Sequence, residues 1–179
     1  MIPQPTLTTD RLLLQALNQQ DQTAIHTLHS DPDVQRYITQ EPPVDLEASA
    51  AFIQKIQEGV QAQRWYYWGL HVKPQTRQLI GTICLWQFTE GNTIAEIGFD
   101  LLPVYQGRGY MSEALQSVLR FAEEDLKLKA IRGLVHAENK TCLRLLTKNR
   151  FAFVRELPPK EKFSSEQDLP IVLFERLRE

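Results

Sequence analysis

The part of the sequence best suited to chemistry is a glycine turn between an apolar run and an amphipathic segment. It reads Gln106-Gly107-Arg108-Gly109-Tyr110. Because glycine has no side chain, two glycines let an anionic group approach the backbone closely. Free amides and the positive dipole end of a helix starting here would attract the same anion. The turn therefore predicts a site for a phosphorylated cofactor.

Two other phosphate-binding motifs do not fit this turn. A P-loop requires Lys-Ser or Lys-Thr after its last glycine, and neither follows Gly109. The Rossmann fingerprint requires a third glycine where Ser112 stands, and an acidic residue about 20 positions later that is missing. A glycine pair before a helix is more often only a tight turn, so its sequence context must decide.

The strands that position the turn follow from short apolar and aromatic runs bounded by turn-forming residues. The three central runs are separated by short polar turns, so antiparallel hairpins are the economical interpretation. The predicted strands cover residues 11–17, 65–72, 78–88, 93–102, 130–136, 153–157 and 170–177.

Helical spacing of apolar residues predicts four helices. The clearest one follows Gly109 and carries apolar residues at i, i+3, i+4 and i+7. The others begin with Asp21 as a cap, after a loop over residues 38–45, and at residues 139–149. Hairpins combined with β-α-β crossovers predict an α/β (α+β) fold in one domain over residues 1–179. The sheet should be mixed, mostly antiparallel, with helices on both faces.

Residues 96–114 resemble the acetyl-CoA-binding motif of the GNAT superfamily of N-acetyltransferases, in which a strand, a glycine turn and a helix hold the diphosphate. The form of the turn is similar to that of the ribosomal-protein N-acetyltransferase branch. Residues 9–14, 31–37 and 139–151 resemble further segments of that branch in the expected order. The resemblance therefore covers nearly the whole chain.

The resemblance implies acetyl-CoA as co-substrate and direct transfer of its acetyl group to an amine, either a protein N-terminus or a small molecule. Arg108 could equally be a solvated surface residue, and Asn139 could also be a helix N-cap. The implied cofactor contacts are Ile97, Gly98, Phe99, Leu101, Gln106, Gly107, Arg108, Gly109, Tyr110, Met111, Asn139 and Cys142.

Three residues are candidates for proton transfer. Glu96 is the first candidate base, because its strand should line the acetyl group; a salt bridge or solvent exposure would also explain it. Cys142 could protonate the departing CoA thiolate, since an ordinary thiol has a matching pKa near 8.5, although a small buried cysteine is commoner. Glu161 falls near a base position of the ribosomal-protein branch.

Gly98 marks either a β-bulge that frees a backbone donor for the cofactor or a packing position.

The sequence also departs from the family pattern. Val104 stands at the first position of the turn motif, Cys142 replaces the usual serine, and Leu146 stands where many relatives have a tyrosine acid. Asn149-Arg150-Phe151 replaces the common Leu-Gly-Phe. Aromatic residues could wall an acceptor pocket, although most should be ordinary core residues. They are Tyr37, Trp65, Tyr66, Tyr67, Trp68 and Trp86.

Composition argues against several other classes of protein. The formal net charge of −2 does not suggest nucleic-acid binding, and no run approaches the roughly 18–20 apolar residues of a membrane span. Two cysteines without paired spacing and the lack of a signal-like N-terminus favour a cytoplasmic protein. The four histidines lack metal-ligand spacing, so no metal is expected. A homodimer is possible.

Two rival functions stay open. The stronger is a module that keeps the cofactor cleft and senses acyl-CoA without turnover, which the missing tyrosine and the replaced serine favour. A nucleic-acid-binding adaptor is the weaker one, because the chain has a slight acidic excess.

Overall fold

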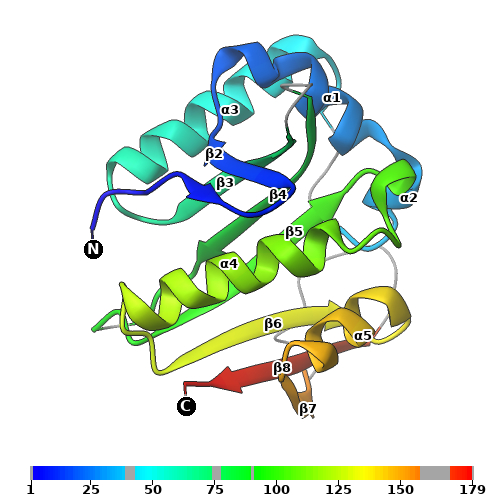
Figure 1. Ribbon diagram of the computed structural model, residues 1–179. Coiled ribbons are helices and arrows are strands. Elements are labelled where there is room, and N and C mark those ends of the chain that lie inside the picture. The colour runs from blue at the N-terminus through cyan, green and yellow to red at the C-terminus, as the bar shows by residue number, and fades with distance from the viewer. Residues whose placement is uncertain (1, 39–42, 74–77, 90, 158–169, 179) are drawn as a thin grey trace.

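The computed structural model describes residues 2–38, 43–73, 78–89, 91–157 and 170–178 (Figure 1). The described strands form one sheet in the order β1-β2-β3-β4-β5-β6-β8-β7. Only β5 and β6 pair in parallel, and all other neighbours are antiparallel. The predicted mixed, mostly antiparallel sheet is therefore confirmed. The strands are β1 (Leu7–Thr8), β2 (Leu12–Ala16), β3 (Tyr66–Val72), β4 (Leu79–Trp86), β5 (Ile94–Leu101), β6 (Ala130–His136), β7 (Ala152–Glu156) and β8 (Ile171–Leu177).

Helices cover both faces of the sheet, as predicted (Figure 1). Alternation along β3 separates the two faces, because Tyr66 and Trp68 pack in one hydrophobic cluster while Tyr67 packs against another. The first cluster includes residues of α4 (Tyr110–Glu124) and α5 (Lys140–Lys148). The second includes residues of α1 (Gln22–Ser30), α2 (Pro32–Gln35) and α3 (Leu46–Gln61).

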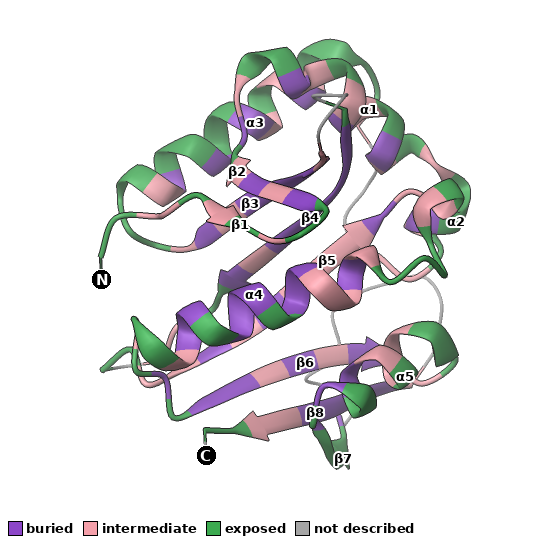
Figure 2. Ribbon diagram, in the orientation of Figure 1, coloured by how far each residue is buried: buried purple, intermediate pink, exposed green. Residues whose placement is uncertain are grey.

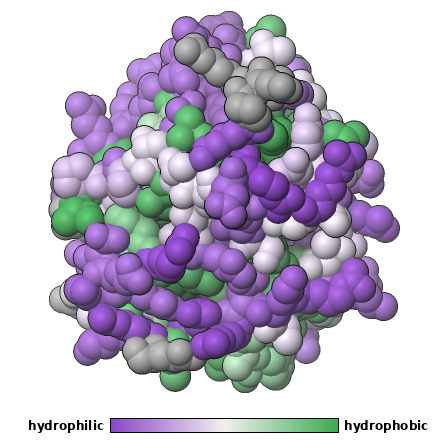
Figure 3. Space-filling view, in the orientation of Figure 1, coloured by the Kyte–Doolittle hydropathy of each residue, from purple (hydrophilic) through white to green (hydrophobic). Residues whose placement is uncertain are grey.

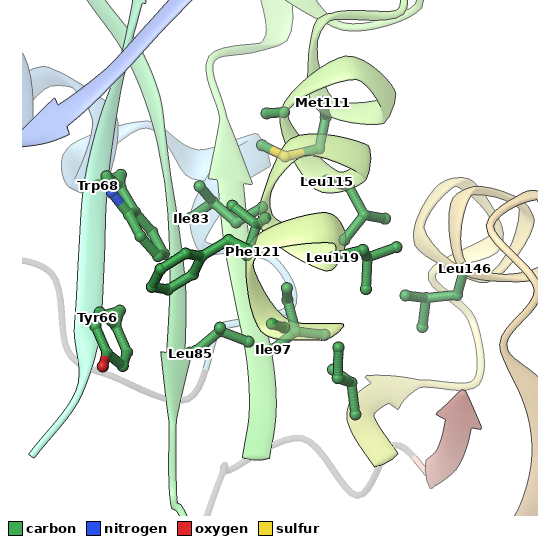
Figure 4. Packing of buried hydrophobic residues seen from close by; sticks show 14 of the residues in the cluster. Tyr66, Trp68, Ile83, Leu85, Ile97, Met111, Leu115, Leu119, Phe121 and Leu146 are labelled. Carbon is green, nitrogen blue, oxygen red and sulfur yellow. The ribbon is translucent and has the colours of Figure 1, made fainter. Parts of the chain in front are cut away.

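The larger core lies between α4 and the central strands (Figure 4). Tyr66 and Trp68 stack with ring centroids 5.9 Å apart, and Phe121 of α4 meets both rings edge-on. Each large apolar side chain fully buried here contributes roughly 1.5–3 kcal/mol. A buried stripe runs along α4 (Figure 2), while the surface on this side is largely hydrophilic with small apolar groups (Figure 3). This packing fixes α4, and with it the glycine turn, against the sheet.

The short elements at the N-terminal side differ from the predictions. Asp21 does not cap α1 through its side chain. Its carboxylate instead accepts hydrogen bonds from the backbone and side chain of Asn18, in the capping box of η1 (Gln19–Asp21). The helix α2 was not predicted, although Asp31 caps it by accepting from Asp33 N and Val34 N. Strand β1 was also missed, because two residues are too few to show a period.

The residues Asn149-Arg150-Phe151 end α5 in a turn where glycine would be usual. Phe151 N donates to Leu146 O and Arg150 N donates to Thr147 O, which is the hydrogen-bond pattern of a Schellman motif. Arg150 therefore has a φ of 65°, in the left-handed region where glycine is preferred. Phe151 and Leu146, the positions whose hydrophobic contact often accompanies this motif, are both buried in the larger core.

Strands β5 and β6 separate halfway along their length. Their pairing ends at Glu96 and Arg132, whereas β5 continues beside β4 to Leu101 and β6 continues beside β8 to His136. Each strand thus keeps its outer partner while the two inner edges part. The carboxyl-terminal half of β5 leads directly through η2 (Pro103–Tyr105) to the glycine turn.

Of the two alternatives for Gly98, a β-bulge or a packing position, the pairing of β4 with β5 favours the second. The register of β4 and β5 passes through the pair Cys84 and Gly98 without a shift. A Cβ atom on Gly98 would lie 3.1 Å from Cys84 Sγ, tighter than most real contacts, so Gly98 is a packing position. The sheet opens on the other edge of β5. Beyond Glu96, β6 no longer pairs with β5 but stays paired with β8.

Candidate active site

A cleft of about 1040 Å³ runs through the opening between β5 and β6. It is lined by β5, β6, the glycine turn and both ends of α5 on one side, and by residues of α1, α2 and α3 on the other. The structure therefore brings together the three segments that the sequence marked for cofactor binding. The cleft reaches all three segments because it passes from one face of the sheet to the other between β5 and β6.

The glycine turn has the backbone conformation that its residues suggest. Gly107 and Gly109 have φ angles of 72° and 81°, both in the left-handed region. Gly109 is the N-cap of α4 and offers no capping side chain, so the first-turn amides of α4 have no partner from the cap. Gln106 Nε2 donates to Leu101 O at 2.8 Å and ties the turn to the end of β5. First-turn amides without a capping side chain, a helix dipole and two bare glycines make an anion site.

Nearly all predicted cofactor contacts line this cleft. Arg108 is the exception: its side chain is exposed and does not border the cleft, so its contact with the cofactor stays a prediction. The residues that do line it are Ile97, Gly98, Phe99, Leu101, Gln106, Gly107, Gly109, Tyr110, Met111, Asn139 and Cys142.

Strand β5 offers backbone groups to the cleft. Leu102 N donates to Ile80 O, so this position points its backbone towards β4. Backbone direction alternates along an antiparallel strand, and Phe99 must therefore point its N–H and C=O away from β4. No residue of β6 pairs with β5 beyond Glu96 in the described sheet. Phe99 can thus hydrogen-bond an extended chain that lies in the opening.

Glu96 lies at the point where the two strands separate and borders the cleft. Burial raises the pKa of its carboxyl group, and the positive charge of Arg132 opposes that rise. Arg132 itself pairs with Glu175, at 2.7 Å between Nε and Oε2. No ion pair of Glu96 occurs within the described residues. A half-buried carboxylate with a raised pKa is a stronger base than an ordinary glutamate.

Cys142 lies in the cleft but does not have the pKa expected of it. Burial raises the pKa of this thiol to about 12, whereas an ordinary thiol such as that of CoA has a pKa near 8.5. Cys142 would therefore hold its proton more firmly than a departing thiolate could take it. Asn139 is the N-cap of α5, and its Oδ1 accepts a hydrogen bond from Cys142 N at 3.1 Å. Leu146 is fully buried and belongs to the core.

The predicted aromatic wall is divided between the two faces of the sheet. Tyr66 and Trp68 lie in the core under α4, and only Tyr37, Trp65, Tyr67 and Trp86 border the cleft. The physical reason is strand alternation, which sends neighbouring residues of β3 to opposite faces. We call the α1–α3 side of the cleft, where the acceptor is expected, the acceptor side.

A chain of polar residues on this acceptor side was not predicted. His29 Nε2 lies 3.3 Å from Asp100 Oδ2, and Thr82 donates to Asp100 Oδ1 through both its backbone N and its hydroxyl. Tyr67 OH lies 3.0 Å from Thr82 Oγ1. The signal for Asp100 was present in the sequence, since it follows Glu96 at the period of two that places residues on one face of a strand. His29 comes from a distant helix and gave no such signal.

Three further points concern residues or features away from this cleft. Glu161 lies outside the described residues. The described residues include no group of three or more His, Cys, Asp or Glu side chains that could hold a metal ion. The same part of the chain has no helix with the length and hydropathy needed to cross a membrane.

Comparison with known proteins agrees with this geometry. RimL, a ribosomal L7/L12 alpha-N-protein acetyltransferase solved in complex with coenzyme A, superposes with a TM-score of 0.86 at 16% identity, covering 97% of this chain and 98% of that one. A GNAT-family acetyltransferase from Bacillus anthracis superposes with a TM-score of 0.80 at 23% identity, over 97% and 98% of the two chains. At these identities the likeness shows the fold.

Sequence comparison shows the family. The chain is 33% identical over 147 residues to YoaA of Bacillus subtilis, an uncharacterized N-acetyltransferase, and the match covers 82% of each chain. The family described as "Acetyltransferase (GNAT) domain" matches residues 11–152. The resemblance inferred from the glycine turn is thereby confirmed, and the chain belongs to the GNAT family of acetyltransferases.

Proposed function

We propose that this chain is a single-domain, acetyl-CoA-dependent N-acetyltransferase that transfers the acetyl group directly to a primary amine. The observation that carries the proposal is the glycine turn at the start of α4, with Gly107 and Gly109 in the left-handed region and bordering a cleft that continues between β5 and β6. The cofactor diphosphate would bind the first-turn amides, and the pantetheine arm would follow β5 past Phe99.

The acceptor amine must reach the thioester without its proton. We propose that Glu96, or a water molecule that it orients, removes this proton, because it borders the cleft where β5 and β6 separate and burial makes it a stronger base than an ordinary glutamate. The neutral amine then attacks the thioester carbonyl, the C–S bond breaks, and CoA leaves as a thiolate. Backbone N–H groups along the opening of β5 would stabilise the oxyanion. The proton that the attacking nitrogen releases as the amide forms can pass through water to the thiolate, so no proton is needed from Cys142, whose pKa burial raises to about 12.

The acceptor that we propose to test first is the N-terminal amine of a ribosomal protein. Presenting an α-amine as the neutral species at pH 7 costs only about 1 kcal/mol, against roughly 4–5 kcal/mol for a lysine-like amine. The smaller cost asks less of a single half-buried carboxylate. RimL, which shares this fold, is an alpha-N-protein acetyltransferase of ribosomal L7/L12. Asp100 adds a second carboxylate on the acceptor side, where an ammonium group would approach. Two unpaired cysteines agree with a cytoplasmic setting.

The test is thiol release from acetyl-CoA in the presence of N-terminal ribosomal peptides and, separately, of small amines. We expect release above the amine-free background with at least one acceptor, and mass spectrometry should find the acetyl group on its amine. CoA binding is measured in parallel by titration calorimetry. Binding without release from any acceptor would refute the enzyme and favour the acyl-CoA sensor, whereas absence of binding would refute the cofactor site itself.

A further inference from the structure

Arg11, which precedes β2, lies against the glycine turn although the two are 97 positions apart in the chain. Its Nη1 donates to the carbonyl oxygen of Arg108 at 2.9 Å, and its Nε donates to Glu113 Oε2 at 2.7 Å. The guanidinium carbon lies 4.5 Å from the ring centroid of Tyr110. A Cβ atom on Gly109 would lie 3.3 Å from Arg11 Nη2. One side chain therefore touches three consecutive residues of the turn and the first turn of α4.

Glu113 anchors the other half of this arrangement. Its Oε1 accepts hydrogen bonds from the hydroxyl of Thr9 and from the backbone N of Arg11. Burial acts to raise the pKa of Glu113, but the hydrogen bonds from Thr9 and Arg11 outweigh it and lower the pKa overall. Glu113 is therefore a carboxylate at neutral pH. An anion in the first turn stabilises the helix, yet it also repels a diphosphate bound at the same helix end.

Arg11 offsets the negative charge of Glu113 and also limits the flexibility of the glycine turn. Its charge offsets that of Glu113, so the anion site keeps its positive potential. Its fork of donors also fixes the carbonyl of Arg108 between two glycines whose backbones would otherwise sample many conformations. A turn already held in its binding conformation loses less entropy when the ligand arrives.

We propose that Arg11 is a positioning residue for the phosphate-binding turn, acting through Arg108 and Glu113 on the diphosphate of the acyl donor. This inference rests on the proposed function, because it takes the diphosphate to lie at Gly107 and Gly109. It assigns Arg11 to the diphosphate and not to the acyl group. Donors that carry the diphosphate should therefore depend on Arg11, and donors that lack it should not.

The test compares acetyl-CoA with S-acetylpantetheine, which has the same thioester and no phosphate. For Arg11→Met we expect kcat/KM with acetyl-CoA to fall about ten- to hundredfold through KM, with kcat nearly unchanged, as for a ligand site misplaced by about 1 Å. The kcat/KM with S-acetylpantetheine should stay within about twofold of the parent value, because no diphosphate contact is lost. Arg11→Lys should recover only part of the loss, since lysine keeps the charge but not the fork.

Arg176 provides a matched control at the other end of α4. Its Nε donates to Glu123 Oε1 and its Nη1 to Asn149 O, both at 2.8 Å, so it also joins a glutamate of α4 to a backbone carbonyl. Arg176→Met should change both donors alike. If Arg11→Met lowers kcat/KM equally with both donors, or with neither, the role of Arg11 is refuted while the proposed function stands. A parent protein that neither binds CoA nor uses acetyl-CoA would overturn the proposed function and this inference together.

Discussion

Adding one methyl group at Gly107 should separate cofactor binding from backbone strain. Gly107 has a φ of 72° and Gly91, in the turn between β4 and β5, has a φ of 79°; a Cβ on either would have nothing within 4 Å. Alanine in the left-handed region costs roughly 1–2 kcal/mol at each position. Gly107→Ala and Gly91→Ala should therefore melt about 2–8 °C below the parent, by similar amounts.

Of these two glycines, Gly107 borders the cleft and Gly91 does not, so only the Gly107 variant should lose affinity for CoA. If the methyl group displaces one hydrogen bond to the diphosphate, the loss is about 1.5–3 kcal/mol, which corresponds to roughly a ten- to 150-fold rise in Kd. Titration calorimetry with CoA, at a temperature where both variants are folded, measures this difference directly.

Two results would refute the reasoning. If Gly107→Ala binds CoA like the parent, the diphosphate does not lie at this turn. If Gly91→Ala loses as much affinity as Gly107→Ala, the effect comes from the folded state as a whole and not from the site.

Three further predictions concern proton transfer and the end of α5. Burial raises the pKa of Glu96 above 4.5, so activity should fall as the pH drops through a value above 4.5. Glu96→Gln should remove this acid limb of kcat/KM and leave the Kd of CoA unchanged; a variant with the parent pH profile would exclude Glu96 as the base. Cys142→Ala should keep kcat within about threefold, because a thiol of pKa about 12 is a poor donor to a CoA thiolate; a loss above about a hundredfold would restore it as the acid. Arg150→Gly should raise the free energy of unfolding by about 0.5–1 kcal/mol, because its φ of 65° suits glycine. The control Lys148→Gly, inside α5, should lower it by about the same amount in thermal denaturation, and stabilisation by both would contradict this account.

The longer elements could be predicted because their signal is local. Apolar residues of α4 repeat at helical spacing and are buried in the larger core, and β6 has the predicted bounds, 130–136. The short elements β1 and α2 could not be predicted, because two to four residues show no period. Asp21 occupies the N-cap position of α1 as predicted, but its carboxylate bonds Asn18 of the preceding turn, since a carboxylate can serve either of two adjoining turns and only the fold selects one.

The cofactor side of the site was more predictable than the acceptor side. The turn and its helix are contiguous in sequence, so Gly107, Gly109 and Tyr110 could be named together. The acceptor side is built from β3, β4, β5 and α1, and the meeting of His29 with Asp100 depends on how α1 packs on the sheet. Arg108 stays a prediction, because sequence position does not show which way an exposed side chain points and the side chain does not line the cleft.

The sequence by itself determined the glycine turn, the helix after it and the longer strands, and the turn with its flanking segments indicated the family. These depend on interactions between neighbours in the chain. The tertiary structure alone decided where β5 and β6 separate, which aromatic residues face the cleft, how burial shifts the pKa values of Glu96 and Cys142, and that Arg11 supports the turn. Each of these depends on contacts or desolvation contributed by segments far apart in the chain, and no local pattern of residues carries that information.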